Sequence, residues 1–236
     1  MMRLLSAARW DVRLQFRNGF YYVSLFTAVI FVVLLKQFDI TAVSYWWPAI
    51  ITINLTVNSF YFMAGLILLE KGEGTLEAQI VTPLRPWEIL GSKVLTLGLL
   101  SLFETLIIIV IVQGVNFNWV FLVMGVVLYI AMLSLYGFII VARYESINEF
   151  LLPSALWTMG FSLPLLYYFD IWRSWVMFLH PLQAVVILIQ AAFRSVPVWQ
   201  IVYGIVYAIL WMVIIMWLSL RAFHRFVVTK EGVRRT

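Results

Sequence analysis

The sequence of 236 residues has no cysteine, and only 11% of its residues are charged. The absence of cysteine excludes disulfide frameworks, thiolate nucleophiles and cysteine-ligated zinc or iron–sulfur sites. Charge is scarce, because about a quarter of the residues of an average soluble domain are charged. The net charge of +5 is therefore carried by few groups, set between long apolar runs, which excludes a nucleic-acid-binding surface.

Apolar residues dominate what remains. Hydrophobic residues make up 64% of the chain and aromatic residues 17%, a composition that excludes intrinsic disorder. The apolar runs are continuous and show no alternation of the kind found in membrane β-strands. The sequence therefore predicts an all-α membrane protein that crosses the bilayer several times.

Seven apolar stretches are long enough to be considered as spans, but the basic residues favour an even number. Arginine and lysine cluster before the first stretch and after the last, and both clusters belong in the cytoplasm by the positive-inside rule. The stretch interrupted by His180-Pro181 is the weakest candidate, because proline breaks a helix and leaves backbone groups unsatisfied in lipid. We expect six spans at residues 20–38, 43–69, 94–114, 119–141, 150–169 and 197–221, with both termini and a tail at 222–236 in the cytoplasm.

The segment at residues 172–194 is then expected to enter the outer face and turn back without crossing. Of the sixteen basic residues, this arrangement leaves only Lys36, Arg173 and Arg194 outside. It predicts a re-entrant or surface-lying helical hairpin before the last span.

The N-terminal segment at residues 2–18 has the pattern of an amphipathic helix. Arg9, Arg13 and Arg17 recur every four residues and share one face, and apolar residues at helical spacing form another stripe, with Trp10 beside it. Such a helix is expected at the inner membrane interface, with its arginines toward lipid phosphates. A simpler interpretation, compatible with the first, is a basic flank that only sets the topology.

The segment between the second and third spans is the most polar of the chain. Residues 70–93 hold seven of the 27 charged residues, so the segment is expected outside the hydrocarbon. Thr75 is a candidate N-cap, and Thr82-Pro83 would end a helix because the residue before proline disfavours the helical region. We therefore expect a helix at 75–82, parallel to the membrane. The alternative is a solvated connecting loop.

This segment resembles a known family. Glu73-Gly74-Thr75-Leu76-Glu77 is followed after four residues by Thr82-Pro83, then by Glu88 and Lys93 at equal spacings. This string is similar to the permease subunits of ABC-2-type ABC transporters. The start of the chain, Arg9-Trp10-Asp11 followed after five residues by Arg17-Asn18-Gly19, is similar to fluoroquinolone-export-type permeases.

The resemblance implies that the short helix is a cytoplasmic coupling helix, which docks on a separate ATPase. The residues that match the motif are Glu70, Glu73, Gly74, Thr75, Leu76, Glu77, Thr82 and Pro83. Two cytosolic ABC ATPase subunits would bind ATP and magnesium, and a second copy or a sister permease would complete the path in a prokaryotic plasma membrane. This chain would not hydrolyse ATP and would not be an enzyme, because it has no phosphate-cradling glycine motif. It would also hold no cofactor and no metal.

One carboxylate, Glu104, lies inside a predicted span, where an ionisable residue is a functional candidate. Asn54 and Asn58 share one face of the second span, and Asn58 is expected at a similar depth to Glu104. We expect Glu104 to meet Asn58 inside the bundle. It serves either as an interhelical fastener or as a contact for the substrate on the translocation path.

The sequence thus predicts the permease subunit of an ATP-driven exporter. Apolar walls favour a hydrophobic or amphipathic substrate, and the resemblance favours a drug-like small molecule. An ABC exporter of lipid or polysaccharide is the nearest alternative. From another class comes an ATP-independent secondary transporter or channel, which would be expected to carry more intramembrane charges and an internal repeat. A membrane-embedded enzyme is a more distant alternative.

Overall fold

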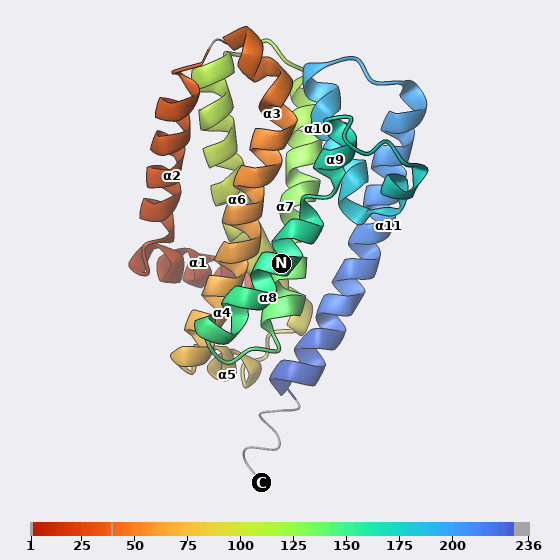
Figure 1. Cartoon of the computed structure of the whole chain (residues 1–236). Helices are drawn as coiled ribbons and strands as arrows, with labels where there is room; N and C mark the ends of the chain where they lie inside the picture. Colours follow the sequence, from red (N-terminus) through yellow and green to blue (C-terminus); the bar gives the residue numbers. More distant parts are fainter. Residues whose placement is uncertain (1, 39, 229–236) are drawn as a thin grey trace.

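The structure, a computed structural model, describes residues 2–38 and 40–228 (Figure 1). Within these residues the secondary structure is entirely helical. Five helices are long and apolar enough to cross a membrane, and a sixth span results if the first two helices, bent by 65° at their junction, count as one. The fold is therefore all-α, as predicted.

The elements follow one another along the chain with short connections. They are α1 Met2–Arg17, α2 Phe20–Leu35, α3 Ile40–Leu55, η1 Thr56–Tyr61, α4 Phe62–Gly72, α5 Thr75–Ile80, α6 Pro86–Gln113, α7 Trp119–Val141, α8 Ile147–Phe161, α9 Pro164–Tyr168, η2 Trp175–Leu179, α10 Pro181–Phe193, α11 Val198–Phe223 and η3 His224–Val228. Helix α5 lies at the bottom of the bundle in Figure 1, and α1 lies above it in the lower half; we call this part of the bundle the α5 end.

The observed helices differ from the predicted spans mainly in length. The third span was predicted to start at residue 94, and the helix that contains it, α6, begins at Pro86, where proline occupies the first turn and Glu88 accepts a hydrogen bond from the backbone nitrogen of Arg85. The second predicted span, 43–69, is one long helix in three parts, α3, η1 and α4, and η1 is a π-helical segment. Helix α11 extends two residues into the predicted tail at 222–236, η3 follows it, and residues 229–236 lie outside the described residues.

Helix α10 lies at the centre of the bundle and packs between α7 and α11. Glycines allow this close approach: a Cβ atom on Gly125 of α7 would lie 3.0 Å from the backbone nitrogen of Ile189. On α11, a Cβ atom on Gly204 would lie 3.1 Å from the carbonyl oxygen of Ala184. Small residues at helix contacts are typical of membrane proteins, where close packing rather than the hydrophobic effect holds helices together.

The chain before and after η2 turns into the bundle and returns on the same side. The hydroxyl of Tyr168 donates to the carbonyl oxygen of Tyr45, and the guanidinium of Arg194 lies 4.5 Å from the ring centre of Tyr168. Between these points the segment lies deeper in the bundle, where the hydroxyl of Tyr207 donates to the carbonyl oxygen of Leu179 at 2.8 Å. Tyr207 is about 14 Å along α11 from the first residue of that helix, at a rise of about 1.5 Å per residue. The segment 172–194 is thus split as predicted, with Pro181 opening α10.

Replacing Gly137 of α7 by alanine is expected to destabilise the protein. A Cβ atom there would lie 2.8 Å from the carbonyl oxygen of Phe60, a backbone atom that cannot rotate away. We expect a loss of about 1–3 kcal/mol, the usual cost of overpacking, in the free energy of unfolding measured in detergent.

Gly160→Ala is the matched control. A Cβ atom on Gly160, in α8, would meet no atom within 4 Å, and alanine is favoured over glycine in a helix by about 1 kcal/mol. The two substitutions should therefore change stability in opposite directions. Equal effects would contradict the close approach of α7 to η1.

Candidate functional site: the α5 end and the buried carboxylate

A buried ion cluster joins three helices at the α5 end. The ammonium nitrogen of Lys93, on α6, lies 2.5 Å from Glu70 Oε1 on α4 and 3.1 Å from Asp11 Oδ1 on α1. The side chains of Lys93 and Glu70 are fully buried. Ser92 also donates to Asp11, at 2.5 Å. Buried charges are tolerated only when they are paired and hydrogen-bonded, as these are.

The short helix α5 is attached to this cluster. Gln79 donates from Nε2 to Glu70 Oε1 at 3.1 Å, and the hydroxyl of Thr75 donates to the carbonyl oxygen of Glu70 at 3.3 Å. Leu76 is buried beneath the helix. A helix this short is marginal by itself, so these contacts to α4 determine its position. A displacement of α5 would therefore act directly on Glu70 and Lys93.

The start of α5 differs from the expectation. Gly74, not Thr75, is the residue that precedes the helix, with a φ of 68° that glycine adopts without strain. The helix ends at Ile80, so Thr82 and Pro83 follow it and are exposed. Val81, directly after the helix, is 67% exposed.

Helix α1 presents two different faces, only one of which was expected. The side chains of Arg9, Trp10, Arg13 and Arg17 are exposed. The opposite face carries Asp11 and Gln15, which are buried against α6, where Gln15 donates to the hydroxyl of Thr96 at 2.7 Å. Arg17 also pairs with Glu73, at 3.2 Å, and so links α1 to the start of the α5 segment.

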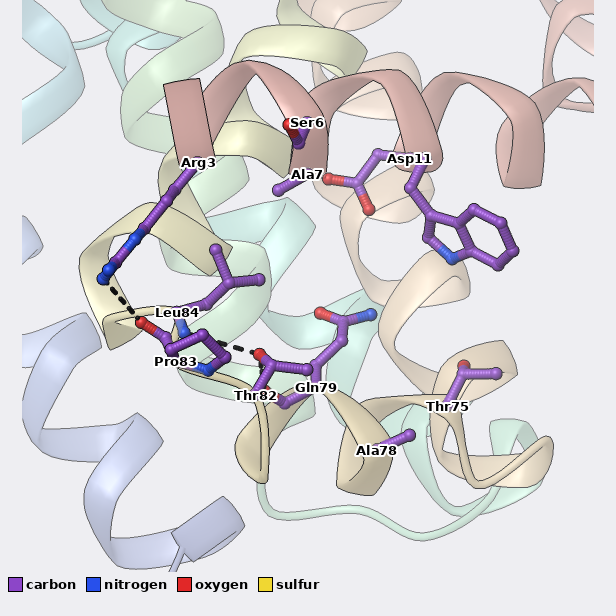
Figure 2. Close-up of a pocket in the computed structure, with 11 residues that line it drawn as sticks. Arg3, Ser6, Ala7, Asp11, Thr75, Ala78, Gln79, Thr82, Pro83 and Leu84 are labelled. Atoms are coloured by element: carbon purple, nitrogen blue, oxygen red, sulfur yellow. Dashed lines mark hydrogen bonds between the residues drawn. The ribbon is translucent and has the colours of Figure 1, made fainter. Parts of the chain in front are cut away.

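A pocket of about 550 Å³ opens between α1 and the α5 segment (Figure 2). Ser6, Ala7 and Asp11 line it from α1, and Thr75, Ala78 and Gln79 line it from α5. Arg3 closes one side through a hydrogen bond of 3.1 Å to the carbonyl oxygen of Pro83. The pocket thus separates α1, which the ion cluster includes, from α5, which is attached to the cluster through Gln79.

The predicted coupling residues therefore divide into two groups. Glu70 and Leu76 are buried and hold α5 in place. The remaining predicted residues, Glu73, Gly74, Thr75, Glu77, Thr82 and Pro83, lie at the surface of the α5 end or only partly covered.

Sequence reasoning did not assign a role to the partners of Glu70. Lys93 belongs to the string that carries the family resemblance, and Asp11 stands on the face of α1 opposite Arg9 and Arg13. The sequence did contain a sign of this contact: Asp11 and Gln15 are polar, lie four residues apart and share a face of the helix that is otherwise small and apolar, which indicates a buried polar partner.

A second polar cluster surrounds Glu104, midway along the bundle. Its carboxylate, 4% exposed, accepts hydrogen bonds from the hydroxyl of Ser24 on α2 and from Asn54 Nδ2 on α3, the latter at 3.2 Å. Asn58 donates to Asn54 Oδ1 at 3.4 Å and so joins the same cluster. The direct contact runs through Asn54, and Ser24 is a partner that sequence reasoning missed. Three helices therefore meet at one buried carboxylate.

Long apolar helices, polar groups gathered inside the bundle and ion pairs at one end define a multi-pass membrane protein. Residues 2–231 match the sequence model of the Fluoroquinolones export permease protein family. The chain belongs to this family. Among its relatives are two proteins called fluoroquinolones export permease protein from Mycobacterium tuberculosis, in strains CDC 1551 / Oshkosh and ATCC 25618 / H37Rv. Each is 30% identical over 236 residues, which cover 99% of this chain and 100% of the relative.

Replacing Lys93 by methionine is expected to destabilise the protein strongly. Glu70 and Asp11 would remain as two buried carboxylates without a counter-ion, and breaking a buried ion pair in this way costs about 3–5 kcal/mol. In a chain of this size that loss lowers the Tm measured in detergent by about 10 °C.

Lys36→Met is the matched control, because Lys36 is exposed at the end of α2. Surface substitutions usually change stability by less than about 0.5 kcal/mol. If the two variants melted at the same temperature, the ion cluster would not be a structural element of the α5 end.

Proposed function

We propose that this chain is the permease subunit of an ATP-binding cassette exporter, which moves hydrophobic or amphipathic drug-like molecules out of the cell. Membership of the fluoroquinolones export permease family supports export of a drug. The names of the two mycobacterial relatives make fluoroquinolones the first substrates to test.

The observation that carries the coupling part of this proposal is the attachment of α5 to the buried ion cluster. Ala78 of α5 and Val81, directly after the helix, are exposed, yet the inner side of α5 is bonded to Glu70. Through Lys93 and Asp11 the same group is bonded to α6 and α1. A push on α5 by an ATPase would therefore reach three helices, in the manner of rigid-body gating.

We further propose six spans with both termini in the cytoplasm of a prokaryotic plasma membrane. Helix α1 is the interfacial helix and α2 the first span, which the 65° bend between them supports. The segment at 172–194 is the re-entrant hairpin on the outer side. Arg194, at its end, lies against Tyr168, four residues before its start, which supports an entry and an exit on the same side.

The partners follow from the coupling proposal. Two cytosolic ATPase subunits supply ATP hydrolysis and bind ATP and magnesium, so this chain performs no catalysis. A second permease, identical or a sister chain, completes the translocation path. The exposed surface around Glu73, Thr75 and Glu77 is the docking site for the ATPase.

The test is to purify the tagged protein from its own host in a mild detergent and to measure which proteins accompany it. We expect a near-equimolar ATPase, identified by mass spectrometry and by ATP hydrolysis in the preparation. The triple variant Glu73→Ala, Thr75→Ala, Glu77→Ala should lower the recovered ATPase by about tenfold, the effect of losing 1.4 kcal/mol of binding free energy.

A triple alanine variant at Lys36, Gln37 and Asp170, on the opposite side of the proposed membrane, is the control and should retain the ATPase. Equal recovery from both variants would remove the docking role from the α5 end. A preparation without any ATPase in several detergents would instead favour an ATP-independent transporter.

A further inference from the structure

The cluster around Glu104 has an excess of hydrogen-bond acceptors. An ionised carboxylate only accepts hydrogen bonds, and its present donors are a hydroxyl and an amide. Among the residues that the structure describes, Asn58 Oδ1 is buried and has no hydrogen-bond partner. Buried acceptors without partners cost free energy, so the cluster is suited to a guest that brings N–H donors.

The cluster also lacks positive charge. In the part of the chain that the structure describes, Glu104 forms no ion pair. Lys93, on the same helix, is about 16 Å away at the helical rise of about 1.5 Å per residue, and it is already paired with two other carboxylates. A buried, unpaired carboxylate is expensive in a membrane, and binding a cation would remove that cost.

A small crevice lies beside the cluster. Phe31, Trp47 and Ile50 line it together with Asn54 and Thr105, and its accessible surface is entirely apolar. Asn54 is also the residue that donates to Glu104. The crevice has a volume of about 10 Å³, room for about one water molecule, so it is closed in this structure. Aromatic faces attract cations and cover apolar groups, which suits a molecule with both.

Helix α2 covers Glu104 and is held by few buried residues. Only Ser24 and Ala28 of this helix are buried, and its other side chains face outward or are partly covered. Gly19, at the 65° bend before α2, has a φ of 84° that favours glycine. Most of the surface of α2 already faces lipid in the proposed arrangement, so a displacement of α2 within the bilayer would cost little hydrophobic free energy. The same displacement would open the crevice toward the bilayer.

We propose that Glu104, together with Asn54 and Asn58, binds the protonated amine of an amphipathic cation that enters from the bilayer beneath α2. The proposal rests on the export function above and names the substrate class: molecules with a basic nitrogen and an apolar, aromatic body. The amine donates to Glu104 and Asn58 Oδ1, and the apolar body lies against Phe31 and Trp47.

The test compares two probes that differ only in the basic nitrogen. One is a fluoroquinolone with a basic piperazine nitrogen, and the other is the same molecule acetylated there. We expect the purified complex to bind the basic probe at least about tenfold more tightly, the effect of one hydrogen bond to a charged group. Glu104→Gln keeps the shape and the bond to Ser24 but removes the charge, and it should abolish this preference without weakening the acetylated probe.

Two further variants separate recognition from helix fastening. Glu104→Asp keeps the charge and should retain the preference, and Ser24→Ala removes a donor to Glu104 and should retain it as well. A preference that survives in Glu104→Gln, or that is missing in the unaltered complex, overturns the proposal. A stable Glu104→Gln complex with its ATPase bound excludes misfolding as the cause of a lost preference.

Transport of the same probes into inverted membrane vesicles distinguishes this inference from the proposed function. ATP-dependent transport of both probes at equal rates refutes amine recognition but leaves the exporter function intact. Selective binding of the basic probe without ATP-dependent transport refutes the exporter function and leaves the binding site intact.

Discussion

The ion cluster of Lys93, Glu70 and Asp11 is the contact on which the arrangement of the α5 end depends. Three charges buried at one point are stable only while all three partners remain, so α1, α4 and α6 cannot separate independently. Helix α5 has too few residues to hold itself and takes its position from Glu70. The surface proposed to meet an ATPase is therefore built directly on an electrostatic link between three helices.

The second buried carboxylate has a different environment. Glu70 and Asp11 share Lys93 as a counter-ion, whereas Glu104 is surrounded by neutral donors on α2 and α3. The first cluster links three helices through charge-assisted hydrogen bonds, which suits it to transmitting a movement. The second holds a carboxylate without a counter-ion beside the unpartnered Asn58 Oδ1, a combination that a bound cation would relieve. A shared counter-ion thus distinguishes the proposed coupling cluster from the proposed recognition cluster.

Much of the fold was predictable because hydrophobic length and the position of proline act locally. The apolar runs of α7 and α11 predicted their helices closely, and Pro181 predicted the division between η2 and α10. The charge of Lys93 suggested that the third span starts at residue 94, whereas α6 continues through Lys93 without interruption. That charge is compatible with a buried position because Glu70 on α4 and Asp11 on α1 pair with it.

The sequence by itself determined the all-helical membrane class of the protein, most of its long apolar helices and the string from Glu73 to Pro83 that carries the resemblance, because these depend on composition, periodicity and short spacings. Only the tertiary structure decided which residues meet. Asp11 and Lys93 are 82 positions apart and Ser24 and Glu104 are 80 positions apart, and no local pattern connects them. Pairing between buried polar groups is a property of helix packing, which brings distant faces together only in the folded bundle.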